Sequence, residues 1–258
     1  MHSFTHVILA LATAAVVTGA PSNYGLHARE ISNPGISKRQ DPGPFTTQLW
    51  GNDNSNFEWD GRSGGEYAVT WDNPSGGNFV VGKGYKGQEM LFNYSGSFEV
   101  DPSANAYLGL YGWTKEPLAE YYVIENTGIH HPADNRNSTC HGYFESDGAT
   151  YEVWSKWRIN APSIIGNADF QQYWSVRTKR HVGGTINTAR HFAAWVEAGL
   201  PLGEQQNMAM GIEGQYGAGE AEITVGVAPT TSVAETTTHT TRTERPMQTN
   251  PCPKKLLD

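Results

Sequence analysis

Cysteine and charge are both scarce in this chain. Of its 258 residues only two are cysteine, Cys140 and Cys252, and only 17% are charged. So few cysteines exclude a small scaffold held together mainly by disulfides. A secreted protein could still join the two, but Cys252 falls in a segment whose composition predicts flexibility. We therefore expect no disulfide within the folded domain.

Positive charge and long apolar runs are scarce as well. Lysine and arginine total 18 against 26 acidic residues, which gives a formal net charge of −8. An acidic surface argues against a nucleic-acid partner, which attracts basic patches. Downstream of the N-terminus no apolar run reaches the ~20 residues that a membrane helix needs. Because nothing in the sequence indicates an oligomer, we expect a monomer with no nucleic-acid or membrane partner.

The N-terminal residues have the pattern of a targeting sequence. An apolar run from Val7 to Val17 ends in small residues and predicts a secretory signal peptide over residues 1–20, although basic residues are missing ahead of the run. Residues 21–39 end in Lys38-Arg39, a dibasic pair that resembles a propeptide cleavage site. The mature protein is therefore expected to be secreted, extracellular, and to begin at Gln40.

The C-terminal residues change composition at Gly226. Residues 226–258 hold nine threonines and four prolines and almost no large apolar side chains. Such a segment cannot bury enough surface to offset the entropy of ordering it, so we expect a disordered tail. The folded domain is then expected over residues 40–225. N-glycosylation sequons at Asn93 and Asn137 are typical of a secreted glycoprotein.

Glycine and aromatic residues, by contrast, are abundant, with 29 glycines, 8 tryptophans and 12 tyrosines. This combination indicates short strands joined by tight turns, with rings left over to line a groove. Strands are predicted for Glu66–Trp71, Asn78–Val81, Met90–Tyr94, Tyr107–Tyr111, Glu120–Ile124, Tyr151–Arg158, Phe170–Arg177 and Met208–Gln215. Strands at this spacing predict an all-β antiparallel sandwich or jelly roll. One helix is predicted, Thr188–Ala198, with Asn187 to cap its start and Gly199 to end it.

The predicted strand Ala119–Asn126 carries the first candidate for chemistry. Side chains alternate faces along a strand, so Glu120 and Tyr122 share one face while Glu125 lies on the other. A carboxylate beside a tyrosine fits a sugar-binding cleft. The alternative is a glutamate on an edge strand that points at water.

A second acid, Glu213, lies on the last predicted strand. Ala209 and Gly211 share its face, and such small neighbours either leave space for a ligand or reflect close packing of sheets. Elsewhere Gln172 shares a face with aromatic residues. Residues 162–166 run from proline to glycine between two strands and predict a structured hairpin loop.

Seven segments, in a consistent order, carry a resemblance to a known family. They are Gly82-Lys83-Gly84, Asn93-Tyr94-Ser95-Gly96-Ser97-Phe98, Tyr111-Gly112-Trp113-Thr114, Glu120-Tyr121-Tyr122, Pro162-Ser163-Ile164-Ile165-Gly166, Gln172-Tyr173-Trp174-Ser175-Val176-Arg177 and Glu213-Gly214. Together they resemble the family 11 glycoside hydrolases, the small endo-β-1,4-xylanases. The resemblance implies a β-jelly roll of two twisted antiparallel sheets with one α-helix and a long cleft. It also implies action on xylan and xylo-oligosaccharides, with no metal or cofactor.

The resemblance assigns roles to both acids. It implies that Glu120 is the nucleophile and Glu213 the acid/base of a retaining double displacement, in which two carboxyls stand ~5–5.5 Å apart. Like charges this close raise one pKa. We expect Glu213 to be the protonated partner while Glu120 stays ionised.

Further positions match cleft residues of the family. Tyr111 and Tyr122 are expected to flank the nucleophile, and Arg158 and Gln172 to bind sugar hydroxyls. Arg158 is also expected to favour an ionised Glu120.

Other matches lie further along the expected cleft. Trp50 would stack on a sugar at the glycone end, and Tyr107 would serve the leaving-group side. The tip of a lid, the family's "thumb", would hold Pro162, Ser163 and Ile164. Asn78 matches the position beside the acid/base, where asparagine is associated with a pH optimum near neutrality.

Two alternatives stay open at this point. A β-1,4-glucanase of related jelly-roll fold would act on cellulose or mixed-linkage glucan, although the residues 162–166 loop is typical of the xylanases. A non-catalytic xylan-binding module on the same scaffold would need neither acid, yet both are present.

Overall fold

The computed structural model describes residues 45–87, 91–133, 137–226, 247–248 and 252. The predictions for a signal peptide over residues 1–20, for a propeptide over residues 21–39, and for most of the tail therefore lie outside the described residues. Within them no helix is long and apolar enough to cross a membrane.

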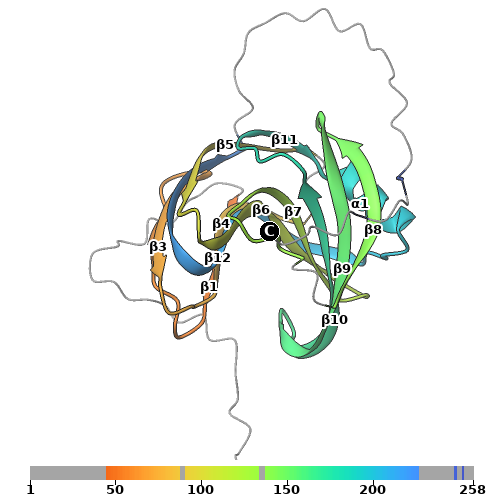
Figure 1. Ribbon diagram of the computed structural model, residues 1–258, viewed down its shortest axis with the longest axis horizontal. Helices are drawn as coiled ribbons and strands as arrows, with labels where there is room; N and C mark the ends of the chain where they lie inside the picture. Colours follow the sequence, from red (N-terminus) through yellow and green to blue (C-terminus); the bar gives the residue numbers. More distant parts are fainter. Residues whose placement is uncertain (1–44, 88–90, 134–136, 227–246, 249–251, 253–258) are drawn as a thin grey trace, which may run out of the picture.

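Strands dominate the described chain, as the sequence predicts (Figure 1). The elements are β1 (Phe45–Gly51), β2 (Phe57–Asp60), β3 (Glu66–Asn73), β4 (Phe79–Lys86), β5 (Leu91–Val100), β6 (Asn105–Lys115), β7 (Ala119–Thr127), β8 (Ser138–Ser146), β9 (Ala149–Ser163), β10 (Gly166–Arg177), β11 (Gly184–Asn187), α1 (Thr188–Glu197) and β12 (Glu204–Val225). Each predicted strand overlaps an observed one. The predicted strands do not include β1, β2, β8 or β11.

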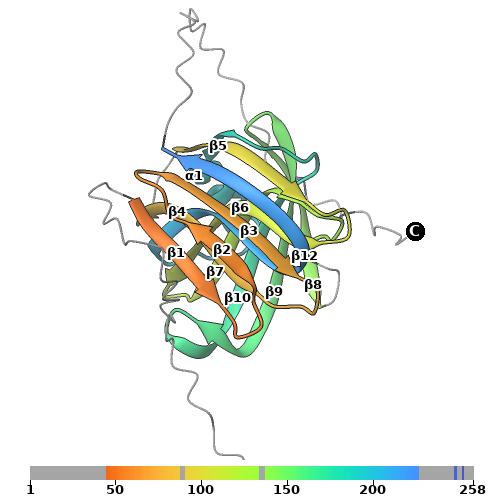
Figure 2. The same cartoon turned by 90° about the vertical axis from the view of Figure 1, so that its left-hand side faces the viewer.

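The strands form two sheets that share one strand. The first sheet has the order β1-β4-β12-β6-β7-β10-β9-β8, and the second joins β2, β3, β12, β5 and β11. The N-terminal part of β12 pairs with β4 and β6, and its part from Gly217 onward pairs with β3 and β5. Gly217 has a φ of +83°, which lets the strand turn from one sheet into the other. Figure 2 shows this long strand crossing the molecule obliquely.

One pairing departs from the expected antiparallel sheets. Strands β7 and β10 are parallel, with Glu120 level with Gln172, whereas the other strand pairs are antiparallel. The chain can reach this arrangement because β8 and β9 intervene in sequence between the two strands. A parallel pair needs such a crossover, whereas a hairpin gives an antiparallel one.

The main core lies between the two sheets. Tyr67, Val69 and Trp71 alternate inward from β3, as predicted, and are at most 4% exposed. Helix α1 adds Phe192 and Trp195 to this core. Asn187 caps the helix by accepting a hydrogen bond from the backbone of Arg190, and Gly199 follows its end with a φ of +76°. A second apolar cluster, rich in tyrosine and tryptophan, covers the other face of the first sheet.

The cysteines contradict the sequence-based expectation. Cys140 and Cys252 form a disulfide with their Cα atoms 5.9 Å apart, and Cys252 is only 8% exposed. Two other residues of the predicted tail also contact the domain: Gln248 pairs with Tyr143 of β8, and the backbone N–H of Met247 donates to Glu197. Composition alone does not predict these contacts, because it does not reveal the disulfide, the edge strand or the helix residue that holds each of the three.

Candidate active site

Both acids lie on one face of the first sheet, on strands separated by β6. Glu213 of β12 is paired with Tyr107 of β6, and Glu120 of β7 is paired with Trp113 of the same strand. Strands that flank a common neighbour are roughly 9–10 Å apart. Gly109 of β6 lies between these partners, and its missing side chain lets Val123 and Ile124 of β7 approach closely. We call this surface the site face.

Glu120 is held by hydrogen bonds from three directions. Gln172 Nε2 donates to its Oε2 at 2.6 Å, and the Tyr122 hydroxyl donates to its Oε1 at 3.1 Å. Tyr111 contributes a further hydrogen bond. The carboxylate is 8% exposed, so these donors replace most of its water. Glu120 therefore has one fixed orientation, toward the open side of the site face.

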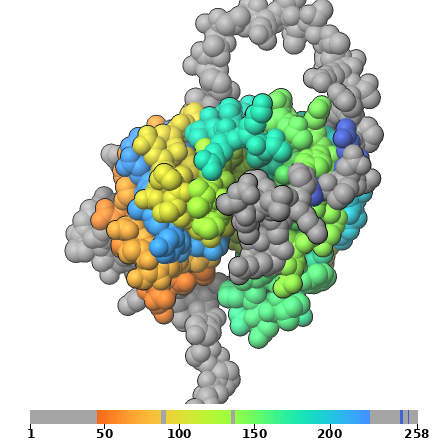
Figure 3. All heavy atoms as spheres, viewed as in Figure 1, coloured from red at the N-terminus to blue at the C-terminus, as the bar shows by residue number. Residues whose placement is uncertain are grey.

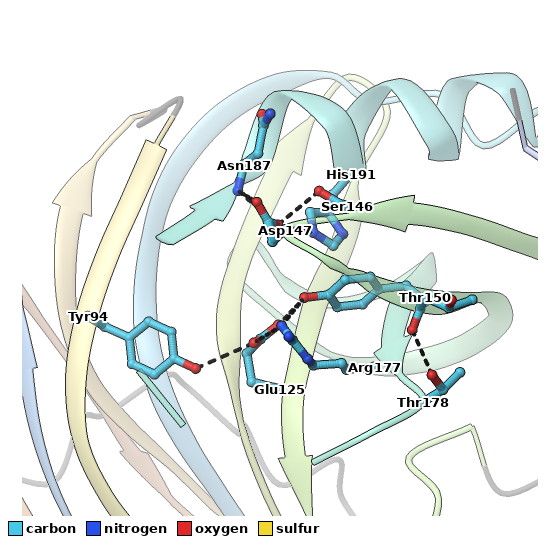
Figure 4. Close-up of polar contacts among 10 residues, drawn as sticks. Tyr94, Glu125, Ser146, Asp147, Thr150, Arg177, Thr178, Asn187 and His191 are labelled. Atoms are coloured by element: carbon cyan, nitrogen blue, oxygen red, sulfur yellow. Dashed lines mark hydrogen bonds and ion pairs between the residues drawn. The ribbon is translucent and has the colours of Figure 1, made fainter. Parts of the chain in front are cut away.

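The opposite face of β7 confirms the predicted separation of the two glutamates of that strand. Glu125 points into the interior, where Tyr151 donates to it at 2.7 Å and Arg177 pairs with it at 2.9 Å. Figure 4 shows Glu125 between Tyr94 and Arg177. Glu125 is 2% exposed and fully engaged, so its role is structural.

Glu213 has its own set of donors. Gln215 Nε2 donates to its Oε1 at 3.3 Å, and Asn78 and Tyr122 also hydrogen-bond its carboxylate. The Tyr122 hydroxyl thus lies between Glu213 and Glu120. Since a hydrogen bond spans about 3 Å, carboxylates that share one hydroxyl are roughly 5–6 Å apart.

Burial raises the pKa of both acids. For Glu120, burial and then the charge of Glu213 raise the pKa to about 7, against the lowering effect of its hydrogen bonds. For Glu213, burial raises the pKa, while hydrogen bonds and Arg158 lower it. The expected order, with only Glu213 raised, is not what the structure gives. Two carboxyls this strongly coupled titrate as a pair, so the pair retains one proton toward neutral pH.

Arg158 is linked to both acids. It extends from β9 and donates to Gln172 Oε1 at 3.4 Å, and Gln172 in turn donates to Glu120. Its charge lowers the pKa of Glu213. Arg158 and Gln172 together place a cation and an amide beside the two acids.

The predicted hairpin loop forms the tip between β9 and β10. Ser163 pairs with Gly166, and the Ser163 hydroxyl donates to the Gly166 carbonyl, which closes the turn. Pro162 is exposed, whereas Ile164 packs against the aromatic cluster of the site face. Figures 1 and 3 show this hairpin curling beyond the sheet at the lower edge of the molecule.

The remaining predicted positions also lie on the site face. Trp50 of β1 pairs with Val80 of β4, which in turn pairs with Glu213, so these residues and Tyr107 form one row across four strands. Asn78 immediately precedes β4 and, as noted above, contacts Glu213. The structure therefore places Trp50 and Tyr107 in the row that contains Glu213, with Asn78 in contact with that acid, whereas Pro162 and Ser163 lie at the hairpin tip.

Two contributors are missing from the predicted site residues. Trp113 Nε1 donates to the Tyr111 hydroxyl at 2.5 Å, which turns that hydroxyl's own proton toward Glu120. Gln215 binds Glu213 and accepts a hydrogen bond from Asn105 at 3.2 Å. Both lie two positions along a strand from a residue that was predicted, so strand parity is the signal that finds them. No group of three or more metal-ligating side chains occurs in the described part of the chain.

Comparison with known proteins places this geometry among characterised enzymes. The sequence model of the family "Glycosyl hydrolases family 11" matches residues 43–224. An ethylene-inducing xylanase of Penicillium digitatum is 38% identical over 226 residues, which cover 87% of this chain and all of that protein. Endo-1,4-beta-xylanase 11B of Humicola insolens is 37% identical, over 88% of this chain and 76% of its own.

A solved structure shares the fold. It comes from a structural comparison of two major endo-1,4-beta-xylanases of Trichoderma reesei, and its superposition has a TM-score of 0.65 at 34% sequence identity. The match covers 70% of this chain and 98% of the solved one. The two-sheet architecture described above is therefore the β-jelly roll that the sequence predicts.

Proposed function

This chain belongs to family 11 of the glycosyl hydrolases, and on that premise we propose that it cleaves xylan by a retaining double displacement, with Glu120 as the nucleophile and Glu213 as the acid/base. As a member of this family with endo-1,4-β-xylanase relatives, it is an endo-xylanase, and its substrate is the polysaccharide xylan. The observation that carries the proposed mechanism is the single hydroxyl, Tyr122, that hydrogen-bonds both carboxylates.

In the first step Glu120 attacks the anomeric carbon and forms a glycosyl-enzyme ester. Glu213 gives its proton to the leaving glycosidic oxygen, so that the leaving chain departs as an alcohol. A spacing of roughly 5–6 Å matches retaining enzymes, whereas inverting enzymes need ~6.5–9.5 Å to admit a water. The donors around Glu120 fix its attacking oxygen, so little reorganisation is needed at the moment of reaction.

In the second step Glu213 acts as a base instead of an acid. Glu213, now ionised, removes a proton from water, which attacks the anomeric carbon from the side the leaving chain vacated. The ester to Glu120 breaks, and the product keeps the β configuration. Because burial raises the pKa of the pair, one proton remains available for the first step as pH approaches neutrality.

The remaining cleft residues fit a substrate that crosses the whole face. The proposed order runs from Trp50 at the glycone end, over Glu213 and Tyr107, to the hairpin tip at Pro162, Ser163 and Ile164. Arg158 and Gln172 would hold sugar hydroxyls under that tip. A face lined along such a row binds an internal stretch of polymer, which supports cleavage within the chain.

The test compares xylan hydrolysis by the wild type with that by Glu120→Gln and Glu213→Gln. Both substitutions preserve shape and remove the ionisable group. We expect each to lower kcat by about 10²-fold or more, the range of acid–base and nucleophilic contributions. The exposed Glu99→Gln is the matched control and should retain full activity. If either catalytic variant kept most of its activity, the assigned roles would be wrong.

The stereochemical outcome tests the mechanism separately. Proton NMR of the first product formed should show the β-anomer before mutarotation. An initial α-anomer would exclude the double displacement while leaving xylan hydrolysis intact. Assay on carboxymethylcellulose covers the glucanase alternative, and release of sugar from cellulose but not from xylan would favour it.

The proposal extends to where the enzyme works. We propose that it is secreted and acts outside the cell as a monomer. The apolar run from Val7 to Val17 supports entry into the secretory pathway. The Cys140–Cys252 disulfide adds support, because disulfides persist in oxidising compartments. Detection of active enzyme in culture medium, at monomer size by light scattering, tests both statements.

A further inference from the structure

A groove on the back of the first sheet lies opposite the site face. It has a volume of about 510 Å³ and is bounded by β8, β9, β10 and the residues that follow α1. This volume is within the ~300–1,000 Å³ of ordinary ligand pockets. Ser155, Trp157 and Ile159 of β9 line it together with Lys156, whereas Arg158 donates to Gln172 beside the two acids. The groove is therefore separate from the substrate cleft.

Two large apolar side chains are exposed at this groove. Trp157 is 59% exposed and Ile159 is 67% exposed, and they follow each other on the same face of β9. Neighbouring apolar side chains left open to water mark interaction surfaces more often than scattered single ones do. The indole face of Trp157 is a platform on which the C–H groups of a sugar ring can pack.

The sequon Asn137-Ser138-Thr139 lies directly beside that platform. Ser138 pairs with Lys156, the neighbour of Trp157, and Asn137 immediately precedes Ser138. Asn137 and Thr139 are both exposed, and both line the groove together with Trp157. A sugar on Asn137 would therefore begin in the same groove as the Trp157 ring.

The local backbone holds Asn137, the residue that would accept the glycan, beside the groove. Asn137 has a φ of +59°, a conformation that asparagine tolerates better than most residues. The hydroxyl of Ser138 donates to the Ala133 carbonyl and ties the turn down. On the far side of Trp157, Gln171 of β10 is level with the ring and offers an amide to sugar hydroxyls. The groove thus combines an aromatic floor with polar walls.

The other sequon lacks these features. Asn93 lies inside β5, level with Thr185 of β11, and its Oδ1 accepts a hydrogen bond from Thr185 at 2.6 Å. Asn93 is half-buried and its side chain is already held by this bond, whereas Asn137 is exposed and lines the groove. The two sequons therefore differ in their surroundings.

We propose that Asn137 carries an N-linked glycan whose first sugars dock in this groove against Trp157. The proposal rests on the proposed secretion, because the sugar is added in the secretory pathway. A tethered glycan has a high effective concentration at the groove, so even weak stacking keeps it seated. The glycan would cover the exposed indole and would stabilise the part of the sheet formed by β8, β9 and β10.

The test uses the full chain, secreted from a glycosylating fungal host. One version keeps its own N-terminus and another has a host leader fused ahead of it, so a failure of the chain's own leader is distinguished from a failure of glycosylation. Peptide mass mapping with and without peptide N-glycosidase should find a glycan on Asn137. Thr139→Ser should keep it, and Thr139→Ala should lose it. An unmodified Asn137 in chain recovered from the medium would overturn the proposal.

Docking is tested by thermal unfolding before and after enzymatic removal of the glycan. We expect the wild-type Tm to fall by roughly 2–4 °C on removal. In Trp157→Ala, which keeps the sequon but lacks the platform, removal should shift Tm by less than about 1 °C. Equal shifts in the two proteins would show that the glycan does not use the groove.

The competing occupant is a free xylan chain. Binding of the glycosylated protein to insoluble xylan is compared with and without Trp157→Ala, in a Glu120→Gln background that prevents hydrolysis. We expect no difference, because the tethered glycan fills the groove. If xylan binding of the glycosylated protein depended on Trp157, the groove would be a polysaccharide site and the docking proposal would be wrong.

Discussion

Tyr122 is the residue on which the arrangement of the catalytic pair depends. Its hydroxyl donates to Glu120 at 3.1 Å and contacts Glu213, and its ring packs 5.1 Å from that of Tyr111. The ring is 5% exposed, so the hydroxyl cannot swing away to water. A single buried hydroxyl thus links the two acids and limits the distance between them.

Removing that hydroxyl should slow catalysis without unfolding the protein. Tyr122→Phe keeps the ring and deletes the donor, so both carboxylates lose a hydrogen bond. We expect kcat/KM on xylan to fall by about 10²-fold, the usual effect of deleting one preorganised donor. Tyr216→Phe, on an exposed tyrosine of β12, is the control and should be neutral. An unaltered kcat/KM in Tyr122→Phe would mean that the shared hydroxyl is dispensable.

The raised pKa of Glu120 has a consequence for stability. Within the coupled pair the pKa of Glu120 is raised to about 7 in the folded protein, whereas the unfolded chain releases its proton near pH 4.5. Because the folded state binds the shared proton more tightly, stability falls as pH rises between these values. Burial of this carboxylate therefore costs stability at neutral pH, and the proposed mechanism depends on the proton that this burial retains.

We accordingly expect Glu120→Gln to be more stable than the wild type above pH 7, by roughly 1–3 kcal/mol. The gain should shrink toward pH 5, where the wild-type pair already holds its shared proton. Thermal unfolding across this pH range measures the difference. Glu99→Gln provides the control for loss of an exposed charge. A pH-independent difference would indicate that the ionisation of Glu120 does not matter to folding.

At the scale of elements, strand parity is what the sequence predicts best. Alternation in β7 correctly separates Glu120 from Glu125, and alternation in β12 puts Glu213 among small neighbours. The spread of β12 over two sheets is not predictable in this way, because strand pattern does not reveal which partners a strand will have. The parallel pairing of β7 with β10 cannot be predicted from the strand pattern either. Register between distant segments depends on the whole fold, whereas parity depends only on local backbone geometry.

The β9–β10 hairpin is bent by an irregularity in its strand pairing. Asn160 has a φ of +48°, and its backbone N–H donates to Asp169 Oδ1 at 2.7 Å. The strand register shifts at the same level, between Ala168 and Phe170. A bulge of this kind bends a strand pair. The bend directs the tip residues Pro162 to Ile164 back over the site face.

Asp169→Ala should therefore loosen the hairpin more than it unfolds the domain. A lost hydrogen bond of about 0.5–1.5 kcal/mol corresponds to roughly a 2–10-fold change in an equilibrium. We expect KM for xylan to rise by about that factor, with a smaller effect on kcat and a Tm within about 2 °C of the wild type. Asn167→Ala, in the same hairpin, is the control. A large fall in Tm would assign Asp169 to global stability instead.

At the scale of the whole molecule, the C-terminal contacts complete the domain. Strand β8 is the edge of the first sheet, and Gln248 pairs with Tyr143 on it. An edge strand with free backbone groups is a template for unwanted pairing, so this contact protects it. Beside it, Cys252 enters the aromatic cluster of the site face. Composition predicts none of this, because the contacts depend on a partner 112 residues earlier in the chain.

The disulfide should make a large contribution to stability. Cross-linking residues that are 112 positions apart removes much of the freedom of the unfolded chain, worth about 5 kcal/mol for a loop of this size. For a domain of this length that corresponds to a fall in Tm of roughly 10–20 °C when the bond is lost. We expect Cys140→Ser/Cys252→Ser to show this fall, while xylan hydrolysis at low temperature is retained because neither cysteine contacts the catalytic acids. Wild type reduced with dithiothreitol should have the same Tm as the double variant, and reduction should leave the variant's Tm unchanged. A reduced wild type that melts within about 2 °C of the oxidised form would show that the domain is complete without its C-terminal link.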